Sequence, residues 1–295
     1  MDRDGPIDPA AGEPPSSGAS PAWPPWLAVV AFLTALIGTL VVVGLAAAIA
    51  GIEADDSASS AFVILTTLVQ GAFFVCSALF FASTVARPRA WHLGLRRAPL
   101  AKALKLSAQA MLGFYLATIA YSVLLQPDVE QTVTERLGAD DGTLGLILAG
   151  IMVMAVAPVV EEIFFRGFFY RALRSRYTFI AAASLDGLLF GAIHYDFESL
   201  DSLLLLPPLA FLGFLFCLVY ERTGSIYPVI GMHAFNNALA YAIQADDGWR
   251  VSLVVLPLVL VACIAVPRFL PHGPRPLPVS PRRVGPEAQL SLPVE

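Results

Sequence analysis

Long apolar runs that alternate with short polar stretches dominate this 295-residue chain. A membrane-crossing helix needs about 20 predominantly apolar residues, and eight runs are long enough. Since the hydrocarbon core offers no water to bond the backbone, each run is expected to form an α-helix. The pattern therefore predicts an all-α, polytopic membrane bundle of about eight transmembrane helices. The runs cover approximately residues 26–50, 60–86, 103–126, 143–165, 178–195, 203–221, 225–244 and 250–270.

The composition excludes a soluble protein and gives no support to nucleic-acid binding. Hydrophobic residues make up 57% of the chain and charged residues 14%, whereas soluble domains carry about 25% charged residues. The mean hydropathy is +0.71. A net charge of −5 does not provide the basic surface that nucleic acids require. The cysteines lie in apolar runs without a short spacing, so we expect buried small hydrophobic residues at Cys76, Cys217 and Cys263.

The two ends of the chain differ from the apolar middle. Residues 1–25 contain acidic residues, Pro, Ser and Gly, and lack the basic start of a signal peptide. This segment is expected to be a disordered tail, and the Pro-rich residues 271–295 are expected to be a second tail. Residues 26–270 form the predicted bundle, with no internal repeat and no separate soluble domain.

The distribution of Lys and Arg predicts the orientation in the membrane. Cytoplasmic loops carry an excess of these residues, and alternation of eight helices places nearly all of them on one side. Both termini are therefore expected to be cytoplasmic, in a multi-pass protein of the plasma membrane. The basic side holds Arg87, Arg89, Arg96, Arg97, Lys102, Lys105, Arg166, Arg171, Arg174, Arg176, Arg222, Arg268, Arg275, Arg282 and Arg283, and the other holds Arg136 and Arg250.

Ionisable residues at membrane depth are costly and usually mark function. Glu161 and Glu162 are adjacent, and Arg166 follows Glu162 by one helical turn, so these two can form an ion pair. Glu161 lies about 100° further round the helix and can point elsewhere. The alternative is an ion-pair cluster where this helix leaves the bilayer.

Two later segments carry polar residues at helical spacing. Phe190 and His194 are four positions apart, as are His233 and Asn237. Each pair shares a helix face, although a lone histidine is often structural and polar groups can simply join helices. Asp186 has no motif around it and is expected to contribute to packing or to line a cavity.

The predicted hairpin places two of these residues at one height. Glu161 and His194 are equidistant from a turn between Tyr177 and Thr178, so they are expected to face each other. At 1.5 Å per residue they lie about 25 Å from the turn, whereas His233 lies only about 12 Å into its helix. The three can meet only if the hairpin projects about 13 Å into the cytoplasm.

Taken together, the motifs resemble those of the CPBP group, which contains the type 2 CAAX prenyl endopeptidases and the bacterial Abi proteins. The resemblance covers roughly residues 143–245, and all motif residues are present in order. It implies an intramembrane endopeptidase that cleaves a membrane-associated or CAAX-like protein or peptide. The implied catalytic residues are Glu161 as general base, His194 as water ligand, and His233 and Asn237 as oxyanion donors, supported by Glu162, Arg166 and Phe190.

Cofactor and function class stay open at this point. Glu161, His194 and His233 could supply three ligands of a zinc site, but no His-Glu-x-x-His arrangement is present, and a water held by Glu and His needs no metal. A non-catalytic Abi-like binding or immunity protein is the main alternative. A transporter is a second one, although transporters often have repeated halves.

Overall fold

The computed structural model describes residues 20–51, 59–126, 133–195 and 200–270. Within these ranges every regular element is a helix, which confirms the all-α prediction. The predicted tails fall largely on residues 1–19 and 271–295, outside the described residues. The helices are α1 Pro25–Ala50, α2 Ser60–Ser83, η1 Ala90–Leu93, α3 Leu100–Leu125, α4 Val133–Arg136, α5 Gly142–Ile151, η2 Met152–Val156, α6 Ala157–Glu162, η3 Ile163–Phe169, α7 Tyr170–Arg174, α8 Phe179–Ala192, η4 Leu200–Leu205, α9 Leu206–Thr223, α10 Tyr227–Gln244, α11 Gly248–Ala265 and η5 Val266–Arg268.

Each of the eight predicted runs corresponds to a helix, but not each helix is long and apolar enough to cross a bilayer. Six segments of the described chain meet that condition by length and composition. α8 is shorter, with 14 residues, and α10 is not among the six, since it carries the polar residues of the third motif. The protein is an integral membrane protein, and the number of eight crossings stays a prediction.

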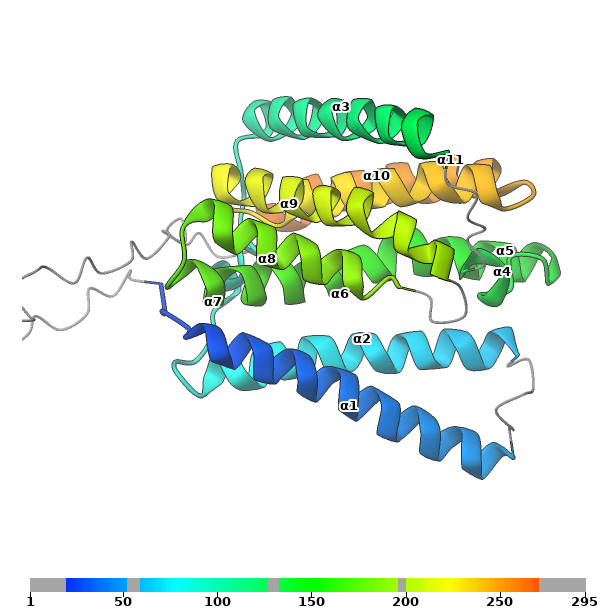
Figure 1. Ribbon diagram of the computed structural model, residues 1–295, viewed down its shortest axis with the longest axis horizontal. Coiled ribbons are helices and arrows are strands. Elements are labelled where there is room, and N and C mark those ends of the chain that lie inside the picture. Colours follow the sequence, from blue (N-terminus) through cyan, green and yellow to red (C-terminus); the bar gives the residue numbers. More distant parts are fainter. Residues whose placement is uncertain (1–19, 52–58, 127–132, 196–199, 271–295) are drawn as a thin grey trace, which may run out of the picture.

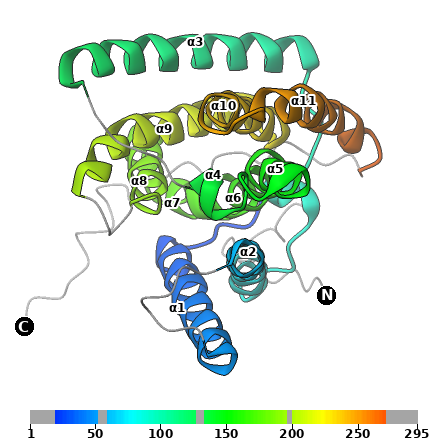
Figure 2. The ribbon, with the colours of Figure 1, turned by 90° about the vertical axis from the view of Figure 1, so that its right-hand side faces the viewer.

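The helices form layers that run along the long axis of the molecule. α1 and α2 lie together on one side, and α3 covers the opposite side (Figures 1 and 2). Between them lie the long helix made by α5 to α7 and the helices α8 to α11. α8 packs along α9, and α10 packs along α11. The three sequence motifs therefore all lie in the middle layers.

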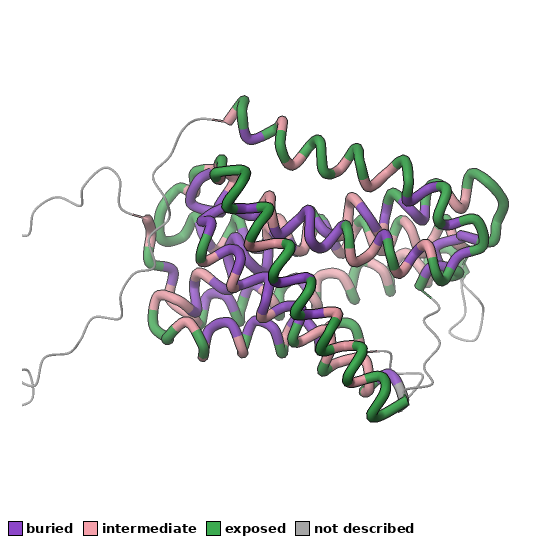
Figure 3. Tube along the Cα trace, turned by 90° about the horizontal axis from the view of Figure 1, so that it is seen from above, coloured by how far each residue is buried: buried purple, intermediate pink, exposed green. Residues whose placement is uncertain are grey.

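The outer surface of the bundle is apolar, as expected for a protein surrounded by lipid. Leu40, Leu124 and Leu258 are exposed by 60% or more, and exposed positions follow the outward faces of the helices (Figure 3). The cysteines do not all match their prediction. Cys217 is buried, but Cys76 is exposed, because the face of α2 that carries it points away from the bundle.

A cluster of aromatic rings joins the outer pair α1 and α2 to the long central helix. The ring of Phe74 in α2 lies 4.8 Å from that of Phe164, and the ring of Phe165 lies 5.4 Å from that of Phe190 in α8. Trp23 packs on Phe168 at 5.3 Å. This packing surrounds η3 and fixes the segment that follows the glutamate pair.

α8 and α9 cross at small residues. A Cβ atom on Gly187 would lie 2.4 Å from the carbonyl oxygen of Ala210, and one on Gly213 would lie 2.8 Å from the Cα atom of Gly187. Only glycine allows the two backbones to approach this closely. The crossing brings the backbone of α9 within reach of side chains from η3.

Candidate active site

The glutamate pair ends α6, a short α-helical segment between two π-helical turns. The turn η2 precedes it and the turn η3 follows it. In η2 the N–H of Ala157 bonds the carbonyl of Met152, five residues back. Such π turns are rare and occur frequently at functional sites, because the extra residue in the turn redirects the side chains that follow.

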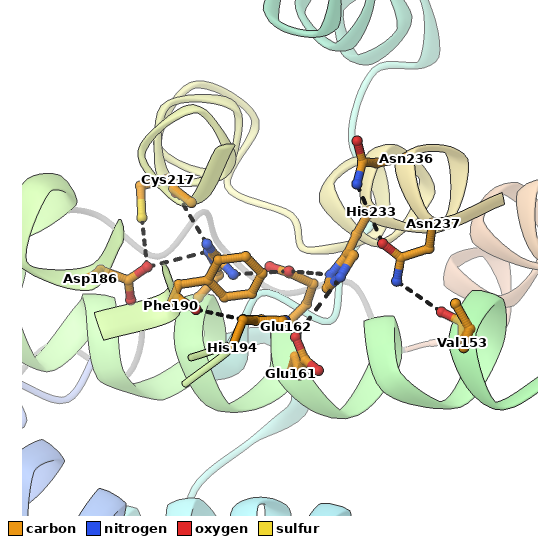
Figure 4. Close-up of polar contacts among 12 residues, drawn as sticks. Val153, Glu161, Glu162, Asp186, Phe190, His194, Cys217, His233, Asn236 and Asn237 are labelled. Atoms are coloured by element: carbon orange, nitrogen blue, oxygen red, sulfur yellow. Dashed lines mark hydrogen bonds and ion pairs between the residues drawn. The ribbon is translucent and has the colours of Figure 1, made fainter. Parts of the chain in front are cut away.

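Glu162 is fully buried and engaged on two sides. One of its oxygens, Oε1, lies 2.9 Å from Nη1 of Arg166, the pair that the four-residue spacing predicts. The same oxygen lies 3.0 Å from Nδ1 of His233 in α10. An ionised carboxylate can only accept, so Nδ1 of His233 carries the proton of this hydrogen bond. Glu162 thereby fixes the orientation of the His233 ring (Figure 4).

Arg166 is the centre of a buried polar network. Its Nε atom lies 3.4 Å from Oδ2 of Asp186, and its Nη2 atom donates to the carbonyl of Gly213 at 3.1 Å. Its guanidinium stacks on Phe190, with Cζ 4.5 Å from the ring centre. The thiol of Cys217 donates to Asp186 at 3.1 Å. The network therefore joins two carboxyl groups and one guanidinium in the interior of the bundle.

Glu161 differs from its neighbour in surroundings. Its side chain is 17% exposed, and its Oε2 atom lies 3.9 Å from Nε2 of His233. That separation is too long for a direct hydrogen bond, and this oxygen is itself buried although the side chain is partly exposed. Among the described residues this oxygen has no hydrogen-bond partner. The two adjacent carboxylates therefore have unequal surroundings, as their angular separation on the helix predicts.

His194 lies just beyond the C-terminal end of α8 and is exposed. Its Nδ1 atom lies 2.7 Å from the carbonyl oxygen of Phe190, so Nδ1 carries the proton and Nε2 is free to accept. The Phe190 ring lies 5.0 Å from the His194 ring and 5.6 Å from the His233 ring. Both histidines thus contact one phenylalanine. No hydrogen bond or ion pair within the described residues joins Glu161 to His194, so their direct facing stays a prediction.

Asn237 bonds a backbone carbonyl. Its Nδ2 atom donates to the carbonyl of Val153 at 2.9 Å. In an α-helix this carbonyl would accept from Ala157, which bonds Met152 instead. In a π-helix it would accept from residue 158, which is Pro158 and has no N–H. The π turn and the proline together free the carbonyl, and Asn237 satisfies it. Its second N–H is still available to a substrate.

The proposed zinc ligands do not form a metal site in the described part of the chain. No group of three His, Cys, Asp or Glu side chains there is placed to hold a metal ion. The Nδ1 atoms of His233 and His194 bond Glu162 and a backbone carbonyl, which leaves both Nε2 atoms free; the misfit is therefore in how the three side chains are grouped, not in the ring nitrogens. Glu161, His194 and His233 as arranged do not fit a zinc ion, and no step below depends on one.

The predicted turn of the hairpin is present between α7 and α8, at residues 175–178. Glu161 lies about 20 Å from the end of α7, and His233 about 9 Å from the start of α10. Since these side chains meet, the turn extends about 10 Å past the start of α10. The turn is thus displaced in the predicted direction, beyond the start of the helix that carries His233. That the turn lies in the cytoplasm stays a prediction.

Two contributors to the site escaped the sequence argument. One is Asp186, expected only to pack or to line a cavity, which is an ion-pair partner of Arg166. Its spacing from Phe190 and His194, four and eight positions, places all three on one face of α8 and could have revealed it. The other is the carbonyl of Val153. Pro158 could have indicated it, because a proline has no N–H to bond a carbonyl in the preceding turn.

The fold and the site define an integral membrane protein with a buried Glu–Arg–His network and a more accessible glutamate beside it. Residues 143–239 match the family described as type II CAAX prenyl endopeptidase Rce1-like. A relative from Bacillus subtilis (strain 168), named "Putative membrane peptidase YdiL", is 32% identical over 96 residues. This match covers 32% of the present chain and 37% of the relative. No solved structure matches. The family match spans the motif-bearing region, so residues 143–239 are similar to this family, in agreement with the resemblance seen in the sequence.

Proposed function

We propose that this protein is an intramembrane endopeptidase that hydrolyses a peptide bond of a membrane-associated or CAAX-like substrate. The observation that carries the proposal is the unequal placement of the two glutamates. Glu162 is held by Arg166 and His233, whereas Glu161 is partly exposed, with one oxygen 3.9 Å from the outer nitrogen of His233. This is the arrangement that a general base and a neighbouring donor require.

In the proposed reaction Glu161 takes a proton from a water molecule as its oxygen attacks the peptide carbonyl. His194 accepts a hydrogen bond from this water at Nε2, because its Nδ1–H is engaged by Phe190. The tetrahedral intermediate carries the negative charge on the former carbonyl oxygen. The C–N bond then breaks, and the proton held by Glu161 passes to the leaving amine nitrogen.

His233 and Asn237 are the proposed donors to the oxyanion. The proposed donor of His233 is its Nε2–H, on the side of the ring opposite the Nδ1–H that bonds Glu162. Asn237 would contribute the N–H that does not bond Val153. A preorganised donor of this kind contributes about 3 kcal/mol to stabilisation of the transition state. Cys217, the cysteine that the described part of the chain places in this network, donates to the buried Asp186 and is not placed as a nucleophile.

The test compares cells that carry the wild-type protein, Glu161→Gln, or the control Glu135→Gln, an exposed glutamate in α4. New termini of membrane proteins are measured by quantitative proteomics. We expect a set of termini that is present with the wild type and the control and absent with Glu161→Gln. Identical termini in all three, at equal protein levels, would contradict the proposal and favour an Abi-like binding role.

A further inference from the structure

A second feature of the molecule lies on the face of α10 that points away from the catalytic network. An apolar groove of about 590 Å³ lies between α3, α10 and α11, a size typical of small-molecule sites. Met111, Phe235 and Leu260 line it from the three helices. Leu104 lines it too and is 59% exposed, so the groove opens to the surrounding lipid.

One end of the groove is basic. Arg97 precedes α3 and Arg268 ends η5, and both line the groove where α10 begins. Both side chains are exposed and have no hydrogen bond or ion pair to any described residue. None of the described lining residues is acidic. Two positive charges without local compensation therefore lie at the mouth of an apolar groove.

The depth of the groove matches one leaflet of a bilayer. Its deepest lining residues along the helices are Met111, 11 positions after Leu100, and Phe235, eight positions after Tyr227. At 1.5 Å per residue the groove extends about 12 to 16 Å from its basic end. The hydrocarbon core of a bilayer is about 30 Å thick. An acyl chain of one leaflet fits this length, with its head group at the level of the arginines.

We propose that this groove is a binding site for an anionic phospholipid, whose phosphate group is held by Arg97 and Arg268 and whose acyl chain lies between α3, α10 and α11. Charge complementarity decides the occupant: a zwitterionic lipid would fill the apolar part equally well but would gain less from two unpaired guanidinium groups. Basic pockets between transmembrane helices at the cytoplasmic side recognise acidic head groups in this way.

The experiment uses the full-length protein in detergent, with native mass spectrometry of bound lipid. The probes are phosphatidylglycerol and phosphatidylcholine with the same acyl chains. Each arginine near a membrane surface favours an anionic lipid by about fivefold, so both together give about a 30-fold preference. We expect this preference in the wild type and in Arg97→Lys/Arg268→Lys, and its loss in Arg97→Gln/Arg268→Gln.

A second pair of variants tests the apolar part separately. Ser107→Trp places a large ring in the groove and should reduce binding of both lipids, whereas Arg250→Gln, at the other end of α11, should change neither. Where Ser107→Trp does not elute as a monodisperse species, Ala108→Phe is the milder replacement. The proposal is overturned if the glutamine double variant keeps the head-group preference, or if filling the groove leaves lipid binding unchanged.

Discussion

At the scale of single residues, the two glutamates should respond differently to the same substitution. Glu162→Gln removes one of two carboxylates that compensate the buried Arg166 and should lower the free energy of unfolding by about 3 kcal/mol. Glu161→Gln removes a partly exposed carboxylate, with a cost below about 1 kcal/mol. Thermal unfolding in mild detergent measures both without a substrate. Equal losses of stability would contradict the separation into one positioning and one catalytic glutamate.

His92 provides a pH-dependent test outside the membrane-spanning segments. Its Nδ1 atom accepts from the backbone N–H of Arg89 at 3.0 Å, which requires a neutral ring. Burial, with the charges of Arg171 and Arg89 nearby, lowers the pKa of His92 from 6.5 to about 4. Protonation therefore favours the unfolded state. The stability from a neutral His92 is complete above pH 6.5 and is lost as pH falls through about 4.

His92→Gln keeps an acceptor for the Arg89 N–H and cannot be protonated in this range. We expect the wild type to lose more of its unfolding midpoint than the variant as the pH falls from 6.5 to 4. The carboxylates titrate in both proteins, so their contribution cancels when the midpoint shift of the variant is subtracted from that of the wild type. Parallel curves for the two proteins would show that His92 is not held neutral in the folded state.

At the scale of elements, the π turn before the glutamate pair is coupled to α10 by one hydrogen bond. Asn237→Leu leaves the carbonyl of Val153 without a donor and should cost about 1 to 3 kcal/mol. Pro158→Ala supplies the N–H that a π-helix would direct to this carbonyl. Asn237→Leu should therefore destabilise the Pro158→Ala variant less than it destabilises the wild type. A double-mutant cycle on the unfolding free energy should give a coupling of about 1 kcal/mol. Additive effects would mean that Asn237 and Pro158 act independently.

The elements also show what the sequence could and could not predict. Apolar length predicted every long helix, and four-residue spacing predicted the pair of Glu162 and Arg166, since both depend only on local geometry. The contact of Glu162 with His233 depends on how α10 packs against α6. Periodicity assigns a residue to a face of its own helix but does not determine which helix covers that face, so this contact required the structure.

At the scale of the whole molecule, the predicted offset between the α7–α8 turn and the start of α10 is present, whereas its position relative to the membrane stays a prediction. Helix rise and turn position placed Glu161 deeper than His233, and the structure brings them together with the α7–α8 turn extended beyond the start of α10. The size of that offset depends on where helices begin. α10 begins at Tyr227 and α7 ends at Arg174, which reduces the offset from about 13 Å to about 10 Å. Such boundaries are the least certain part of a sequence-based prediction.

The orientation of the bundle leads to the last prediction. The α7–α8 turn carries exposed Arg176, and the turn between α10 and α11 carries exposed Asp246. The helices between them place these turns at opposite ends, and the excess of Lys and Arg assigns the first to the cytoplasm. Single cysteines replace Arg176 or Asp246 in a chain with Cys76→Ala, Cys217→Ser and Cys263→Ala. A membrane-impermeant maleimide should label the Asp246 position in intact cells and the Arg176 position only after permeabilisation. The reverse pattern would invert the orientation, and labelling of both from outside would contradict the alternation of the helices.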